Sequence, residues 1–144
     1  MVKSKRFQPV RRVAESRERN AARELGDAKR WVQLQEEKLR ELRDYHLEYL
    51  QRFQEAARAG MSASQLLEYR AFIEKLERAI GEQEEAVAEG QRRCELNREQ
   101  WLEKHRRHQV IGKVVERVES AEGKVEQVRE QKATDELNLH PGRK

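Results

Sequence analysis

Apolar residues recur along the first half of this chain at alternating spacings of three and four, which is the pattern of a coiled-coil seam. The heptad a positions are Leu25, Val32, Leu39, His46 and Phe53, and the d positions are Ala28, Gln35, Leu42, Tyr49 and Ala56. Eight of these ten residues are apolar or aromatic. Pro9 suits the first turn of a helix, where its missing N–H is not needed. We therefore predict a helix over about residues 9–58, roughly 75 Å long at 1.5 Å per residue. Small apolar residues extend the apolar face upstream, at Val10, Val13, Ala14, Ala21 and Ala22.

The periodic run breaks at residues 58–64, which contain the strongest turn signal in the interior of the chain. Gly60 suits the position just after a helix, and Ser62 or Ser64 can cap the free N–H groups of the next helix. We place the turn at about residues 59–63. The same seam pattern then resumes and predicts a second helix over about residues 63–133, roughly 105 Å long. The tail, residues 134–144, is expected to be disordered.

Two long helices joined by a short turn run antiparallel. The position of the turn requires that the numbers of facing residues add up to about 121. This rule places bulky residues against small ones, because Trp31 falls opposite Gly90 and Trp101 opposite Ala21. A filled core needs such complementarity. We therefore predict an all-α fold in which residues 1–144 form a single domain, a long antiparallel two-helix coiled-coil hairpin with unequal arms.

The arms are expected to differ in length because the first helix runs out of chain near residue 10, opposite about residue 111. An exposed apolar stripe usually marks an interaction surface, although valines on a frayed helix can also be merely tolerated. The stripe could also pair with a second copy, so we expect a monomer or weak self-association. The residues of the second helix left without an intrachain partner are Val114, Val115, Val118, Val125 and Val128.

The composition agrees with a hairpin that has a single seam to fill. Charged residues make up 40% of the chain and hydrophobic residues 36%, which is too thin an apolar fraction for a conventional enzyme core. The net charge of +4 is concentrated at the ends, because residues 1–12 hold five basic residues and no acidic one. The rest of the chain is mixed and slightly acidic and would repel a phosphate backbone. We therefore expect no nucleic-acid partner, and a coiled coil that binds nucleic acid through residues 3–12 is the weaker alternative.

Motifs for catalysis, cofactors or metals are missing from the sequence. No apolar run approaches 18 residues, and the basic N-terminus lacks the apolar stretch of a secretory signal, so we expect a cytoplasmic protein without a membrane-spanning helix. His105 and His108 are spaced for one ligand, but basic neighbours oppose a cation. His46 and Cys94 fall at seam positions, where a packing role is expected. We predict no catalytic residue, no cofactor and no metal, and hence a protein that is not an enzyme.

Two aromatic residues, Tyr45 and Phe72, fall at g positions outside the seam. The pairing rule brings them to nearly the same level of the hairpin, where they join Tyr49 and Leu76 in an apolar patch on one side. Aromatic side chains at a surface are favoured anchors for a partner. The alternative is a core that widens near the turn.

The runs Asp-Tyr-His-Leu-Glu-Tyr at residues 44–49 and Tyr-Arg-Ala-Phe-Ile-Glu-Lys-Leu-Glu-Arg-Ala-Ile at residues 69–80, with the spacing between them, resemble the FliJ family. The length, the basic N-terminus and the hairpin extend the resemblance over nearly the whole chain. FliJ proteins belong to the flagellar type III export apparatus. The resemblance implies a fold similar to the central stalk of rotary ATPases. It also implies a non-enzymatic role that couples the hexameric export ATPase FliI, with its partner FliH, to the membrane export gate protein FlhA.

The resemblance also implies binding of export chaperones and a location at the inner-membrane face of the flagellar basal body. Two alternatives remain open, a general export chaperone or scaffold and the equivalent stalk of a virulence type III secretion system. The family's gate-binding stripe corresponds here to Lys38, Leu42, Tyr45, Tyr49, Phe72, Leu76, Ala79 and Gln83. Candidates to face the ATPase are Arg6, Arg11, Arg12, Val115, Val118 and Val125.

Overall fold

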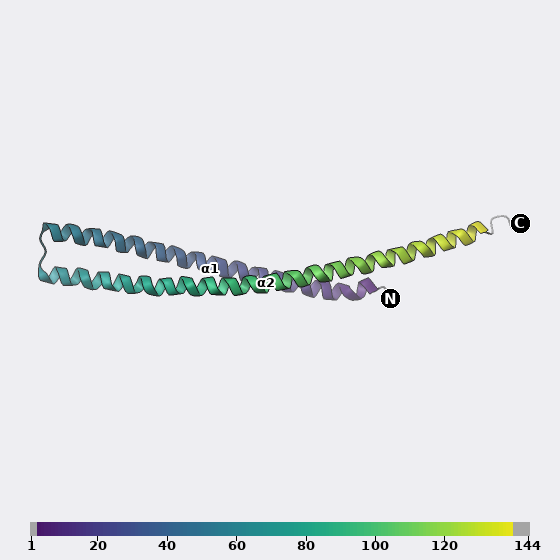
Figure 1. The fold of residues 1–144 in the computed structure, drawn as a ribbon, viewed down its shortest axis with the longest axis horizontal. Coiled ribbons are helices and arrows are strands. Elements are labelled where there is room, and N and C mark those ends of the chain that lie inside the picture. Colours follow the sequence, from purple (N-terminus) through teal and green to yellow (C-terminus); the bar gives the residue numbers. More distant parts are fainter. Residues whose placement is uncertain (1–2, 140–144) are drawn as a thin grey trace. The chain divides into compact units, whose positions relative to one another are not determined.

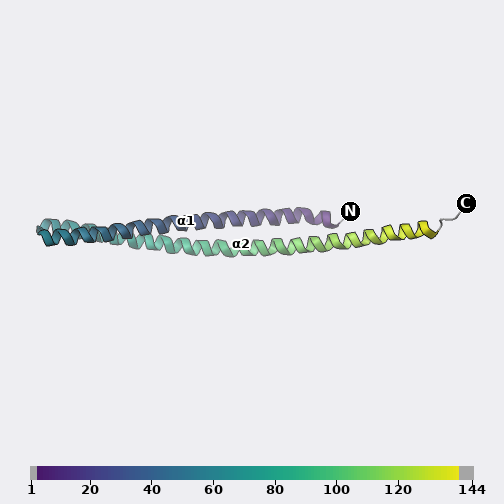
Figure 2. The ribbon, with the colours of Figure 1, turned by 90° about the horizontal axis from the view of Figure 1, so that it is seen from above.

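The computed structural model describes residues 3–139, which form two long helices joined by a short turn. Helix α1 spans Lys3–Ala59 and helix α2 spans Ala63–Leu139. The two helices pack against each other as the two arms of a hairpin (Figure 1 and Figure 2). The predicted all-α hairpin is confirmed. The described residues group into two compact units. We call residues 23–99, which include the turn, the tip unit, and residues 3–22 with 100–139 the terminal unit; the assignment of the chain to a single domain stays a prediction.

The turn has the chemistry that the sequence predicts. Gly60 has a φ of 97°, a left-handed conformation that glycine adopts without steric cost. Ser62 caps α2, because its Oγ accepts a hydrogen bond from the backbone N–H of Gln65 at 3.1 Å. The side chain of Gln65 returns the contact by accepting from the backbone N–H of Ser62 at 3.2 Å. This reciprocal pair is a capping box, and it fixes the residue at which α2 begins.

The seam follows the predicted heptad register. Every a and d position of α1 from Ser4 to Ala56 is buried or half-buried, and in α2 the same holds from Tyr69 to Glu122. The predicted pairing of facing residues is confirmed where Trp31 packs against Gly90. In the tip unit, the Nε2 of Gln83 donates to the side-chain oxygen of Gln35 at 2.8 Å and to its backbone oxygen at 2.9 Å. A polar pair of this kind inside an apolar seam penalises any slip of one helix along the other.

Trp31 packs directly over Gly90 in the tip unit, as the pairing rule predicts. Gly90 is buried, and a Cβ built on it would lie 2.5 Å from Cζ3 of Trp31 and 3.0 Å from Cγ2 of Val32. No side chain other than hydrogen fits at residue 90 without moving the indole. The glycine therefore lowers the helix propensity of α2 but provides a socket for Trp31.

The start of α1 differs from the prediction. The helix begins at Lys3 and carries Pro9 inside it, whereas the prediction placed Pro9 in the first turn. The reason is a cap supplied by the other helix. The carboxylate of Glu122 accepts a hydrogen bond from the backbone N–H of Ser4 at 3.0 Å and another from its hydroxyl at 2.7 Å. Free N–H groups at a helix start need such an acceptor.

This longer α1 corrects two sequence-based expectations. Val115 was expected to lack an intrachain partner, but it is 0% exposed because α1 reaches far enough to cover it. Val10 and Val13 were expected on the apolar face of the seam, but they are exposed, and so is Ala22. In the terminal unit the seam positions of α1 are instead Ser4, Phe7, Arg11, Ala14, Glu18 and Ala21, which are small or polar apart from Phe7.

The predicted disordered tail is also partly wrong. Helix α2 continues through residues 134–139, where Thr134 donates its hydroxyl hydrogen to the backbone oxygen of Glu130 at 2.9 Å. No glycine or proline interrupts this stretch before Pro141, so nothing in the sequence forces the helix to stop earlier. Residues 140–144 lie outside the described residues.

One carboxylate in the terminal unit binds two histidines across the seam. The Nδ1 atoms of His105 and His108 donate to the two oxygens of Glu18, at 2.6 Å for His105. The hydrogen bond from His105 is the main cause that lowers the pKa of Glu18, against the opposing effect of burial. The ring of His105 also stacks on Trp101, with 5.0 Å between the ring centroids. The pair of histidines thus has a role in holding the two helices together.

We predict that Gly90→Ala destabilises the hairpin while Gly81→Ala stabilises it. Both changes improve helix propensity by about 1 kcal/mol. A Cβ at residue 81 has no neighbour within 4 Å, whereas one at residue 90 overlaps the indole. Overpacking costs about 1–3 kcal/mol. Thermal unfolding followed by circular dichroism should show a raised midpoint for Gly81→Ala and a lowered one for Gly90→Ala. Equal stabilisation by both changes would contradict the socket.

We predict that Glu18→Gln lowers stability at neutral pH and that this loss fades in acid. The pKa of Glu18 is lower in the folded chain than its ordinary value of 4.5. Its carboxylate therefore stabilises the fold above about pH 4.5 and stops doing so as the pH falls through the lowered value. Hydrogen bonds to a charged group contribute about 1.5–3 kcal/mol. Denaturant unfolding at pH 7 and pH 3 measures the difference. Glu15→Gln is the matched control, because Glu15 forms only an exposed pair with Arg19.

Candidate interaction surfaces

The eight residues predicted to bind the export gate all fall at d and g positions in the tip unit. In an antiparallel hairpin the g positions of both helices border the same flank of the seam. The structure accordingly brings these residues together along one side of the tip unit, although they come from segments separated by the turn. We call this set the aromatic flank; its members are Lys38, Leu42, Tyr45, Tyr49, Phe72, Leu76, Ala79 and Gln83.

The rings of the aromatic flank contact one another across the two helices. The ring centroid of Tyr49 lies 4.4 Å from that of Phe72, and Tyr45 approaches Phe72 edge-on at 6.1 Å. Tyr49 also contacts Tyr69 at 5.4 Å, and Phe53 contacts Tyr69 at 5.7 Å, so the cluster extends into the seam. Aromatic pairs at these distances stabilise packing beyond the area they bury. The patch is therefore both a wider core near the turn and a surface, and the two interpretations of the sequence are compatible.

The members of the aromatic flank differ in how far a partner can reach them. Tyr45 is 44% exposed and Lys38 is also exposed, whereas Leu76 is 7% exposed and belongs to the core. Gln83 is half-buried and uses its amide to bind Gln35. A shallow hollow of about 410 Å³ lies beside Tyr45. A partner would therefore contact Tyr45 and Lys38 first, whereas Leu76 and Gln83 support the surface by packing beneath it.

The candidates to face the ATPase do not share one surface. Arg6 and Arg12 are exposed, but they occupy heptad positions c and b and so border different flanks. Arg11 lies at an a position and is half-buried in the seam, and Val115 is fully buried. Val118 is half-buried, and Val125 is 53% exposed. Val115 is therefore unavailable to a partner as long as α1 covers it.

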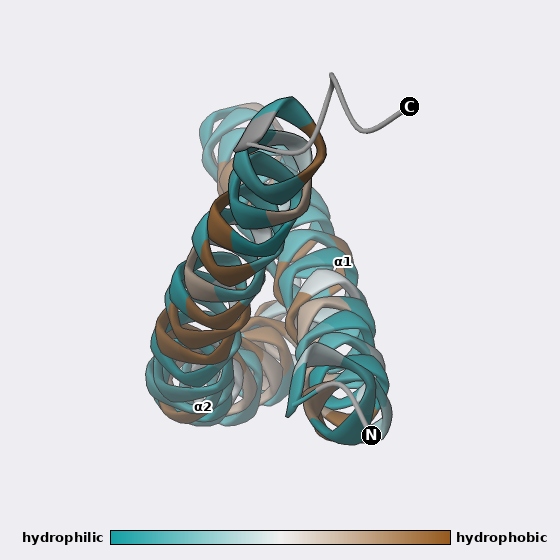
Figure 3. Cartoon of the chain, turned by 90° about the vertical axis from the view of Figure 1, so that its right-hand side faces the viewer, coloured by the Kyte–Doolittle hydropathy of each residue, from teal (hydrophilic) through white to brown (hydrophobic). Residues whose placement is uncertain are grey.

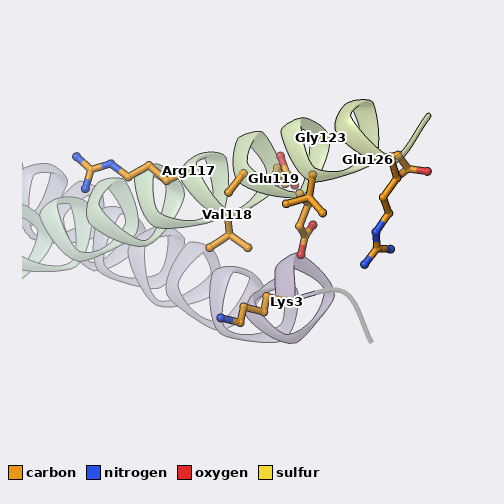
Figure 4. A pocket seen from close by; sticks show the side chains of 10 residues that line it. Lys3, Arg117, Val118, Glu119, Gly123 and Glu126 are labelled. Atoms are coloured by element: carbon orange, nitrogen blue, oxygen red, sulfur yellow. The ribbon is translucent and has the colours of Figure 1, made fainter. Parts of the chain in front are cut away.

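The first turn of α1 and the neighbouring part of α2 border an open hollow of about 850 Å³. Figure 4 shows Val118 pointing from α2 toward α1, with Lys3 on the opposite wall. Glu122 also lines this hollow, and the backbone N–H of Ser4 lowers the pKa of its carboxyl by hydrogen bonding. Its charge is thus used to cap α1. The remaining walls are mixed, because acidic Glu119 and Glu126 line the hollow beside apolar and basic side chains.

Sequence reasoning found only part of a second apolar surface in the terminal unit, because the predicted stripe included Val114, Val125 and Val128 but not Val10, Val13 or Val110. Val10 and Val13 of α1 line a hollow of about 380 Å³ together with Ile111 of α2, and Arg17 and Arg107 stand at its edges. The sequence does contain a signal for this surface. When the heptad register is extended upstream to Ser4, valines fall at c and g positions. In Figure 3, apolar turns of this kind interrupt an otherwise hydrophilic ribbon of α2. We call this set the valine flank; it comprises Val10, Val13, Val110, Val114, Ala121, Val125 and Val128.

The described residues contain no arrangement suited to a metal ion, since no group of three or more metal-binding side chains converges in a suitable geometry among residues 3–139. The carboxylate nearest to His105 and His108 belongs to Glu18, on the other helix. It accepts a hydrogen bond from the Nδ1 atom of each histidine. Within the same residues, neither α1 nor α2 has a stretch long and apolar enough to cross a membrane.

Comparison with known proteins identifies the family. Residues 3–143 match the family model described as flagellar FliJ protein. The chain is 31% identical to the flagellar FliJ protein of Escherichia coli K12 over 125 residues, which cover 87% of this chain and 85% of that protein. It is 29% identical to the flagellar FliJ protein of Salmonella typhi over 131 residues, 91% of this chain and 89% of the relative.

A solved structure has the same fold. The protein CT670 of Chlamydia trachomatis, described as a YscO homolog, superposes with a TM-score of 0.62 at 19% identity, covering 92% of this chain and 91% of that one. The hairpin thus recurs where few residues are shared. The match to the family model over nearly the whole chain shows that this protein belongs to the flagellar FliJ family, a component of flagellar type III protein export.

Proposed function

We propose that this protein is a non-enzymatic stalk that couples the export ATPase FliI to the export gate protein FlhA. The aromatic flank of the tip unit is the observation that carries this proposal. Tyr45 remains 44% exposed although its ring packs against Tyr49 and Phe72, at centroid distances of 6.2 and 6.1 Å. A ring that is held rigidly and still open to solvent loses little conformational freedom when a partner covers it.

The two units would bind different partners. The tip unit binds FlhA through the aromatic flank, with Tyr45 and Lys38 as the accessible residues. The terminal unit faces the FliI ring, in the manner of the central stalk of rotary ATPases, and Arg6, Arg12 and Val125 are its exposed candidates. The stalk performs no chemistry. It acts by binding some states of the ring and the gate more tightly than others and so shifts their populations.

Export chaperones and FliH complete the proposed set of partners, at the inner-membrane face of the flagellar basal body. A general export chaperone or scaffold is the main alternative within the same apparatus. It would hold unfolded secretion substrates on exposed apolar side chains and leave the ATPase unaffected. The stalk of a virulence type III secretion system would have the same mechanism with different partners, so the identity of the gate protein bound distinguishes it.

We predict that Tyr45→Ala combined with Phe72→Ala weakens binding to the cytoplasmic domain of FlhA by about 30-fold or more. Aromatic anchors at the centre of an interface contribute about 2 kcal/mol or more each, with losses that are not additive. The measurement is a pull-down followed by titration of purified proteins, with circular dichroism to show that helix content is unchanged.

The matched control is Leu47→Ala combined with Leu67→Ala. Both leucines are exposed, lie on the same two helices of the tip unit and occupy b positions off the aromatic flank. This variant should bind FlhA as the parent protein does. If binding survives in the Tyr45 and Phe72 variant, or falls equally in the control, the aromatic flank is not the gate-binding surface.

We predict that adding this protein to FliI raises both hexamer formation and the rate of ATP hydrolysis. The reason is that a stalk that binds the assembled ring favours that state by mass action. Arg6→Ala with Val125→Ala should weaken the effect severalfold, whereas Arg58→Ala with Leu67→Ala, an equivalent exposed pair in the tip unit, should not. Sedimentation and a phosphate-release assay measure the two effects. An unchanged rate at saturating protein would favour the chaperone alternative.

A further inference from the structure

The valine flank is exposed although the seam beneath it is already filled. Val10 and Val13 are 48% and 49% exposed, and Val128 is 63% exposed. Below them, Ala14 is buried and Val115 is completely covered. The hairpin therefore does not need these valines for its own core. A run of apolar side chains that is left in water on one flank indicates a surface that a partner covers.

The shape of the flank is concave. Val10 and Val13 border the hollow of about 380 Å³ whose far wall is Ile111 of α2. The hollow of about 850 Å³ lies farther along α2, where Ala121 and Val125 line it together with Glu119 and Glu126. The smaller hollow lies on the side of the terminal unit where g positions of the two helices face each other, and the larger one extends from this side across the seam to e positions of α2. Together they provide a shallow groove in which the side chains of one helix can be seated.

Basic residues border this groove. Among c and g positions of residues 3–22 and 100–128 there are six basic residues and one acidic residue, Glu103. All six basic side chains are exposed, and none forms an ion pair with a carboxylate among residues 3–139. We call them the basic rim; they are Lys3, Arg6, Arg17, Arg107, Arg117 and Lys124.

The other flank of the same unit is different. Its b and e positions within residues 3–22 and 100–130 hold five acidic and three basic residues, and exposed valines are absent from them. The combination of exposed valines and an excess of basic side chains is therefore confined to one side of the unit. This asymmetry is what makes the flank specific for one kind of partner.

We propose that the valine flank and its basic rim bind an amphipathic helix whose apolar stripe is bordered by acidic side chains. The partner's apolar residues fill the two hollows, and its carboxylates pair with Arg17 and Arg107 at the edges. This inference does not depend on the coupling function, because it rests on the packing and charges of the terminal unit alone.

Two other occupants fit the surface less well. A second copy that docks flank to flank would bring one basic rim against another, which is unfavourable. A membrane surface is met by protruding bulky residues such as tryptophan, phenylalanine or leucine. At c and g positions of this unit the apolar residues are only valine and alanine, and Val10, Val13 and Ala121 line hollows. An acidic helix satisfies both the shape and the charge.

The test uses the full-length protein and a fluorescently labelled synthetic peptide of about three heptads, with leucine at a and d and glutamate at e and g, so that the peptide does not pair with itself. Fluorescence anisotropy at low and high salt measures its affinity. We expect saturable binding that weakens with salt. The variant Arg17→Glu with Arg107→Glu should lose about tenfold or more in affinity, since two attractive contacts become repulsive.

The matched control is Arg12→Glu with Arg106→Glu, which makes the same charge change on the same two helices but off the flank. It should bind within about threefold of the parent protein, since rim charges away from a contact matter little. Circular dichroism verifies that both variants remain helical. Four results would overturn the proposal: equal losses in both variants, equal binding of a peptide with lysine in place of glutamate, self-association that blocks the peptide, or binding to anionic vesicles without binding to the peptide.

Discussion

Two helices that pack only against each other share a single line of contact, and this constraint governs the rest of the molecule. Long helices owe most of their stability to tertiary packing of one face. Each unit of this protein therefore depends on two positions in every seven, and the others are free to be charged. The tip unit fills its seam with large side chains such as Tyr49 and Phe53, while the terminal unit uses small ones such as Ala14 and Ala21. The width of the seam decides which flanking residues remain open.

A single apolar seam does not by itself fix the register, because a slip of one heptad leaves apolar residues opposite apolar residues. The polar contacts remove this ambiguity. Gln83 binds Gln35 in the tip unit, and in the terminal unit Glu18 binds two histidines and Glu122 caps α1. Each of these contacts would leave a buried polar group without a partner if the helices slipped. Buried side-chain polar atoms without a hydrogen bond are absent from the described residues.

The heptad pattern was sufficient to predict the two helices, the turn at Gly60 and the pairing of Trp31 with Gly90, because all of these follow from local spacing and one antiparallel rule. The start of α1 could not be predicted in this way. Its cap is Glu122, more than a hundred residues away in the sequence, so the local signal at Pro9 was misleading. The same long-range contact explains why Val115 is buried. The aromatic flank was found from its g positions, but only part of the valine flank on α2 was found, because the register was not carried upstream along α1.

The distinction between a core and a binding surface is sharper in one unit than in the other. In the tip unit Tyr49 and Phe72 contact each other and also border the surface, so a change at either affects folding and binding together. Tyr45 separates the two effects better, because its ring is largely at the edge of the cluster. In the terminal unit Val115 fills the seam and Val13 lies outside it, so the two roles belong to different residues. Exposed valines above a completed seam contribute little to folding, and their apolar character is therefore better explained by contact with a partner.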